Sequence, residues 1–119
     1  MRRGRFVYRL LAMPIQVTRT YLELGSAAAL RPGPVPDPAP AVERVGACPA
    51  SFYRYLYAEV GRAFHWVDRL GWSDDAIRRH LDTPGLSLWL LTFEAAPAGY
   101  FELAPHDDGS VEIAYFGLL

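Results

Sequence analysis

The feature that most constrains the fold is the apolar run that occupies residues 110–119 at the end of the chain. Its β-branched and aromatic residues predict a buried strand, and no turn, cap or polar tail follows Leu118 and Leu119. Large apolar side chains at the end of a strand need a following element to cover them. We therefore expect these residues to belong to a truncated domain whose next residues supply a turn and a helix.

The composition limits the chain to one globular domain. It has 119 residues, of which 51% are hydrophobic, and its formal net charge is −1. Such a balance excludes a disordered segment and a basic tail that binds nucleic acid. All 12 basic residues are arginine, so no lysine is present to form a Schiff base or to act as a general base.

The cysteine and histidine content predicts no metal site. Cys48 is the only cysteine, which rules out an intramolecular disulfide and a thiolate cluster for zinc. The three histidines, His65, His80 and His106, lack the spacing of metal ligands. His65 and Asp68 lie close enough in sequence to share an ion, but two ligands make a weak site.

Residues 1–14 are expected to be an N-terminal extension. Their short apolar run is interrupted by Arg9 and lacks a cleavage site, unlike a secretory signal. Met1 and Met13 both remain possible starts. No stretch approaches the roughly 20 apolar residues that span a bilayer. We expect a cytoplasmic protein that contacts neither a membrane nor nucleic acid.

Residues 15–24 alternate and are rich in β-branched residues, which predicts a first strand. The Pro- and Ala-rich stretch 25–50 predicts an extended connector. Apolar residues at helical spacing then predict a helix from an N-cap at Ser51 to His65. Ser73 predicts the cap of a second, short helix that begins with Asp74 and Asp75 and ends at residues 83–85.

Three strands are expected after the helices, at residues 86–94, 99–103 and 110–119. Turn signals separate them at residues 95–98 and 105–109, and the second contains Asp-Gly, a strong hairpin signal. The predicted order is one strand, two helices and a three-stranded antiparallel meander. Grouped helices beside an antiparallel sheet define the α+β class.

This order of elements resembles the N-terminal half of the GNAT superfamily of N-acetyltransferases, over residues 15–119. Two segments are similar to family strands: residues 97–103, which read Pro-Ala-Gly-Tyr-Phe-Glu-Leu, and residues 111–119, which read Val-Glu-Ile-Ala-Tyr-Phe-Gly-Leu-Leu. An aromatic-rich segment between the helices is similar to one bacterial branch; it contains Tyr57, His65, Trp66, Asp68 and Trp72.

The resemblance implies an acetyl-CoA-dependent enzyme that acetylates an amine. In the family, the backbone of the fourth strand holds the cofactor, and the matching positions here are Phe116, Gly117 and Leu118. Gly117 either permits close approach of a ligand or marks a bulge or strand end. The family motif Arg/Gln-x-x-Gly-x-Gly/Ala, which binds the pyrophosphate, is absent, so we expect the chain by itself to be inactive.

Glu112 is the expected catalytic base. It falls where a branch of the resembled family has its glutamate base, and its spacing from Phe116 predicts that both share a strand face. A carboxylate in apolar surroundings suits proton abstraction from an ammonium group. The alternative is a solvated or arginine-paired glutamate. Glu102, on the neighbouring strand, is expected to be a polar face residue or a member of a water network.

The resemblance implies that the acceptor is a small-molecule or peptide amine, and aromatic walls with an acid would suit such a cation. The residues expected to bind it are Tyr57, His65, Trp66 and Asp68. Tyr53 and Phe64 are expected in the core. An alternative function is a non-catalytic binding or dimerising module, and the terminal strand is a candidate for self-association.

Overall fold

The computed structural model describes residues 2–10 and 13–119, with side chains from residue 14 onward. The chain divides into two compact units, with the boundary between Val35 and Pro36. The extension expected at residues 1–14 therefore falls inside the first unit. Its residues 1, 11 and 12, including the candidate start Met1, lie outside the described residues.

The first unit contains an antiparallel pair of strands, β1 (Arg2–Leu10) and β2 (Met13–Tyr21), followed by a short 3-10 helix, Ala27–Ala29. Residues 15–21 of the strand expected at residues 15–24 belong to β2, whose partner is β1, so this strand is not part of the sheet that contains the meander. Alternation identifies a strand and not its partner, and β1 is the partner nearest in sequence.

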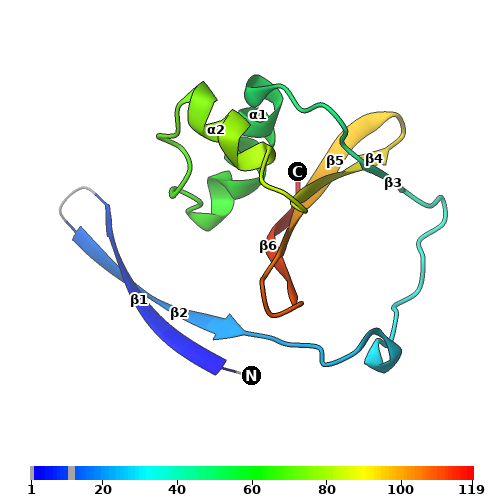
Figure 1. The fold of residues 1–119 in the computed structure, drawn as a ribbon, viewed down its shortest axis with the longest axis horizontal. Helices are drawn as coiled ribbons and strands as arrows, with labels where there is room; N and C mark the ends of the chain where they lie inside the picture. The colour runs from blue at the N-terminus through cyan, green and yellow to red at the C-terminus, as the bar shows by residue number, and fades with distance from the viewer. Residues whose placement is uncertain (1, 11–12) are drawn as a thin grey trace. The chain divides into compact units, whose positions relative to one another are not determined.

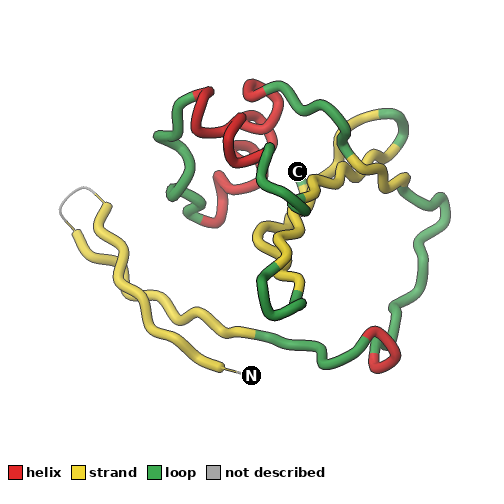
Figure 2. The backbone as a smooth tube through the Cα atoms, viewed as in Figure 1, coloured by secondary structure: helices red, strands yellow, loops and turns green. Residues whose placement is uncertain are grey.

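The second unit has the α+β class that the sequence predicts. Its antiparallel sheet has the order β3-β4-β5-β6, and Figure 1 shows two helices, α1 and α2, beside it. Figure 2 distinguishes the helical turns of α1 and α2 from the strands along the backbone. The elements are β3 (Ala41–Arg44), α1 (Ala50–Gly61), α2 (Asp74–Leu81), β4 (Ser87–Phe93), β5 (Ala96–Pro105) and β6 (Val111–Leu118).

The first strand of this sheet is β3, which lies inside the stretch 25–50 that we expected to be a connector. β3 pairs with β4 along its whole length, with Val42 opposite Leu91. Its four residues are too few to show a reliable period within a proline-rich stretch. The pairing with β4 therefore gives the segment its strand structure.

The meander of β4, β5 and β6 is confirmed, with one corrected turn. β4 and β5 are joined by Glu94 and Ala95 alone, and β5 already begins at Ala96. Both turn residues have positive φ angles, 51° and 62°. Gly, Asn or Asp is the usual signal for such a two-residue turn, so Glu-Ala gave no indication of it. The turn before β6 contains Gly109 with a φ of 85°, as its Asp-Gly signal predicts.

The helices begin and end close to the predicted residues. α1 starts at Ala50 with Pro49 as its N-cap, so Ser51 is not the cap that we expected. After α1, a 3-10 turn, Arg62–Phe64, ends at His65, which has a left-handed φ of 55°. α2 has the predicted cap, because the side chain of Ser73 accepts a hydrogen bond from the backbone N–H of Ala76 at 3.1 Å.

The core of the second unit lies between the helices and one face of the sheet. Its buried members are Ala50, Tyr53, Leu56, Val60, Ile77, Leu88 and Tyr100. Tyr53 is in the core as expected. Phe64 is 65% exposed, so our assignment of it to the core was wrong. It lies beyond the end of α1, where the helical spacing that suggested burial no longer applies.

Candidate functional site

A buried carboxylate stands at the centre of the site. Glu102 lies in the middle of β5 and is 0% exposed, the only charged residue among the buried ones in the described part of the chain. A buried charge is tolerated only when it is paired and hydrogen-bonded. Our expectation of a polar face residue was wrong for Glu102, because its strand face is the one that the helices cover.

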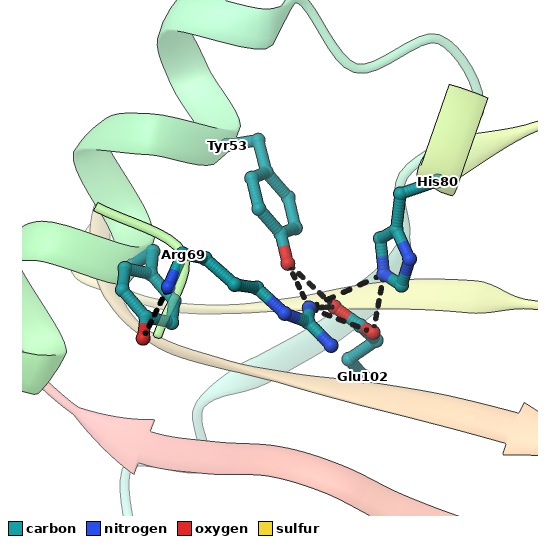
Figure 3. Close-up of polar contacts among 5 residues, drawn as sticks. Tyr53, Arg69, His80 and Glu102 are labelled. Atoms are coloured by element: carbon teal, nitrogen blue, oxygen red, sulfur yellow. Dashed lines mark hydrogen bonds and ion pairs between the residues drawn. The ribbon is translucent and has the colours of Figure 1, made fainter. Parts of the chain in front are cut away.

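Three side chains from three different segments converge on Glu102, as Figure 3 shows. Arg69, from the loop between the helices, places Nη1 at 2.8 Å and 3.1 Å from the two carboxylate oxygens. Tyr53 of α1 donates its hydroxyl at 2.9 Å. His80 of α2 lies with Nε2 at 2.7 Å. Arg69 also donates to the Tyr53 hydroxyl, so the four residues form one polar cluster.

The electrostatics of the cluster favour an ionised glutamate. Burial by itself raises the pKa of Glu102, but the hydrogen bond with His80 and the charge of Arg69 outweigh it and hold that pKa below its ordinary value. Burial and the nearby carboxylate raise the pKa of Tyr53, which remains a neutral donor. Glu102 and Arg69 therefore form a charged pair at neutral pH.

The ionised state of Glu102 also fixes the tautomer of His80. A carboxylate only accepts hydrogen bonds, so Nε2 of His80 carries the proton that it donates to Glu102. The 3.2 Å approach of Arg69 Nη1 to the same nitrogen is then a contact between two donors and not a hydrogen bond.

Arg69 is also held by aromatic residues. Its guanidinium lies over the rings of Trp72 and Tyr115, with Cζ at 4.8 Å and 4.4 Å from the ring centroids. Its backbone N–H donates to the hydroxyl of Tyr57 at 3.2 Å. Aromatic faces and an acid surround a cation here, but none of the three is a residue that we predicted to bind the acceptor. That cation is the chain's own arginine.

The predicted cofactor residues line a second feature, an open surface cavity of about 390 Å³. Its walls are Phe64, Trp66, Phe116, Gly117 and Leu118. The three positions at the end of β6 are therefore brought together with Trp66, one of the residues predicted to bind the acceptor. The walls are mostly apolar, so the cavity suits an uncharged part of a ligand.

Gly117 is required by packing. A Cβ at this position would lie 2.3 Å from Cγ1 of Val60 and 3.5 Å from Cη2 of Trp66. The space beside Gly117 is thus taken by α1 and by the Trp66 ring, a reason that neither of our two interpretations contained. The bulge of β6 lies elsewhere, at Ala114, which the register leaves between Tyr115 and Ile113.

This bulge changes the position of Glu112. Directly paired residues share a sheet face, and Phe116 is opposite Phe101 whereas Glu112 is opposite Ala104. Glu112 and Phe116 therefore lie on opposite faces, and our prediction that they share one was wrong, because the extra residue shifts the alternation. The Glu112 side chain is 57% exposed and lies 2.9 Å from Nε2 of His106, not in apolar surroundings.

The residues predicted to bind the acceptor do not form one pocket. Tyr57 is buried and its ring contacts that of Trp66 at 5.7 Å between centroids. His65 and Asp68 are exposed on the loop between the helices. In residues 2–10 and 13–119, no group of three or more His, Cys, Asp or Glu side chains is arranged to hold a metal ion.

Sequence reasoning missed Arg69 and His80 and gave Tyr53 only a packing role. One available signal was the position of Glu102 two residues after Tyr100, which puts both on the same face of β5. A carboxylate on the face of a buried aromatic residue requires a cation or several donors. The identity of those donors depends on residues 22 to 49 positions away in the chain.

Comparisons with family models, with curated proteins and with solved structures found no match to this chain. No helix in its described residues has both the length and the apolar character needed to cross a membrane.

Proposed function

We propose that this chain is part of an acetyl-CoA-dependent N-acetyltransferase domain similar to the GNAT superfamily, acting on a small-molecule or peptide amine. One observation carries the proposal: the cavity lined by Trp66 and residues 116–118. It combines the three positions that the resemblance assigns to the cofactor with one that it assigns to the acceptor. An uncharged arm of acetyl-CoA matches the mostly apolar walls.

The order of elements in the second unit also supports the proposal. A strand, two helices and a three-stranded antiparallel meander follow one another, and β3 takes the place that we first gave to residues 15–24. Fold order alone does not establish a reaction, since unrelated functions share folds. The argument for acetyl transfer therefore rests on the cavity and on the resemblance of its residues.

Acetyl transfer requires a deprotonated amine held against the thioester. Glu112 remains the proposed base. Its carboxylate is exposed, so an amine can approach it, and His106 is its hydrogen-bonding neighbour. Glu102 is enclosed and fully paired, so it has no free oxygen to offer a substrate. Its role in this proposal is to support the residues around the cavity.

The test is acetyl transfer by the complete protein whose reading frame contains this chain. Release of free CoA is measured with a thiol reagent against a panel of amines. The variant Glu112→Gln should lower turnover by about 10²-fold and flatten the acid limb of the pH–rate profile, while Glu94→Gln in an exposed turn should not. The proposal fails if that protein neither binds acetyl-CoA nor acetylates any amine; unchanged rates in Glu112→Gln remove only Glu112.

The 119-residue chain lacks the pyrophosphate motif and should bind acetyl-CoA very weakly. The backbone N–H groups of that motif supply much of the affinity for the cofactor. Calorimetric titration at neutral pH measures this directly. A dissociation constant in the low micromolar range would contradict the expectation.

A second candidate function, a non-catalytic binding or dimerising module, is favoured by the sheet face opposite the helices. The rings of Trp89, Phe101 and Phe116 follow one another across it, with centroids 5.9 Å and 6.5 Å apart. Ile113 and Phe116 are 65% and 66% exposed. Such a face favours association through β6. A monodisperse monomer in analytical ultracentrifugation at tens of micromolar would count against this function.

A further inference from the structure

The loop of residues 62–73 joins α1 to α2 and carries both Trp66 and Arg69. Its middle has no helix or strand, and its position depends on backbone hydrogen bonds, such as that from the Trp66 N–H to the Gly61 carbonyl at 3.2 Å, together with side-chain contacts. At its far end, the carbonyl of Trp72 accepts a hydrogen bond from Arg54 at 2.9 Å. Near its centre, Arg69 forms a 2.8 Å ion pair with the fully buried Glu102.

Trp66 packs closely against Gly61. A Cβ on Gly61 would lie 2.3 Å from Cβ of Trp66, whereas a Cβ on Gly117 would make an ordinary contact of 3.5 Å with the far edge of the ring. The Trp66 ring contacts that of Tyr115 edge-on at 4.8 Å. One side of Trp66 therefore faces the packed tyrosines, and Trp66 also forms part of the cavity wall.

Arg69 reaches Trp66 by two routes. Along the backbone, only two residues separate them, and the N–H of Arg69 donates to Tyr57, whose ring also contacts Trp66. Through space, the guanidinium lies over Tyr115 at 4.4 Å, and the same tyrosine ring contacts Trp66. Removal of the guanidinium takes away the contact with Tyr115 and the pair with Glu102, and it leaves the backbone hydrogen bond to Tyr57 in place.

We propose that Arg69 is a positioning residue, which through its buried pair with Glu102 holds the Trp66 ring as a wall of the cavity lined by residues 116–118. The significance of that cavity for acetyl transfer rests on the proposed function, but the positioning itself does not. The cavity in its formed state accepts an uncharged, mainly apolar ligand segment. Loss of the Arg69–Glu102 pair releases this wall without any change in a residue that lines the cavity.

The experiment uses the 119-residue chain labelled with 5-fluorotryptophan and observed by fluorine NMR. The chain has three tryptophans, Trp66, Trp72 and Trp89, whose resonances are assigned with single Trp→Phe variants. Trp89 lies on the opposite sheet face and serves as the internal reference. Trp72 touches the guanidinium directly, so its response is expected in any case and decides nothing.

In Arg69→Met, the Trp66 resonance should shift by more than its linewidth and broaden, while that of Trp89 stays in place. Arg69→Lys keeps the charge but loses the planar fork, so a smaller shift of Trp66 is expected. Arg79→Met, on the exposed side of α2, is the matched control and should leave all three resonances unchanged. Spectra are compared where circular dichroism shows each variant folded.

A wild-type Trp66 resonance in a folded Arg69→Met variant would overturn the proposal and leave Arg69 a purely stabilising role. If Arg69→Met does not fold, Arg69→Lys decides the question by the same criterion. A displaced Trp66 supports the positioning role whether or not acetyl-CoA binds. The proposed function fails separately, in the acetyl-transfer assay, so the two failures are distinguishable.

Discussion

The pair formed by Arg69 and Glu102 should be the most sensitive point of the fold. The Arg69 side chain is 13% exposed and that of Glu102 is 0% exposed, so removal of either partner leaves the other charge without its main partner and away from water. Breaking a buried pair in this way typically costs about 3–5 kcal/mol. A domain of this size has only ~5–15 kcal/mol of stability, so each single variant should lose a large part of it.

A double-mutant cycle tests this magnitude. Arg69→Met leaves an unpaired carboxylate, and Glu102→Gln leaves an unpaired guanidinium. The double variant contains neither, and the new amide can accept from His80 through its oxygen and donate to the Tyr53 hydroxyl oxygen through its NH2 group. The double variant should therefore cost less than the sum of the single variants, with a coupling energy toward the upper end of about 0.5–3 kcal/mol. A loss of 3 kcal/mol corresponds to a fall in Tm of roughly 12–24 °C.

Urea unfolding followed by circular dichroism supplies the four free energies of unfolding. The control is Arg78→Met, which removes the partner of Asp75 in an exposed pair of 3.0 Å and should cost about 0–1 kcal/mol. The reasoning is refuted if either single variant at the buried pair loses less than about 1 kcal/mol, or if the double variant loses the full sum.

Three further measurements test the cap, the packing and the pH dependence. Ser73→Ala removes the hydroxyl that caps α2 and should cost about 1 kcal/mol in urea unfolding, whereas Ser51→Ala, which caps nothing, should cost much less; equal losses would contradict the assignment of the caps. Gly117→Ala places a methyl group 2.3 Å from a side chain of α1 and should cost about 1–3 kcal/mol of stability. Gly71→Ala, in open space, should cost much less. If Gly117→Ala leaves the stability unchanged, α1 can move to make room for the methyl group. The folded-state pKa of Glu102 lies below its ordinary value of 4.5. The stability that ionised Glu102 contributes is therefore fully present above that pH, and it is lost as the pH falls through the folded-state pKa. The free energy of unfolding of wild type should therefore exceed that of Glu102→Gln by less and less below about pH 4.5. A difference that grows in acid would show that the pKa of Glu102 is shifted in the opposite direction.

The sequence by itself determined the elements whose signals are local. The Asp-Gly turn before β6, the Ser73 cap and the helical spacing within α1 each involve residues a few positions apart, and the structure contains all three. The α+β class follows from the order of those elements. Local patterns of this kind do not depend on which segment packs against them, so they can be recognised from the sequence alone.

Tertiary structure alone decided which strands pair and which faces are buried. β3 is a strand because β4 lies beside it, and the bulge at Ala114 moves Glu112 to the face opposite Phe116. Glu102 is buried because both helices cover its face, and its charge persists there because Arg69 pairs with it. These outcomes depend on contacts between distant segments, whose register and burial no local period encodes.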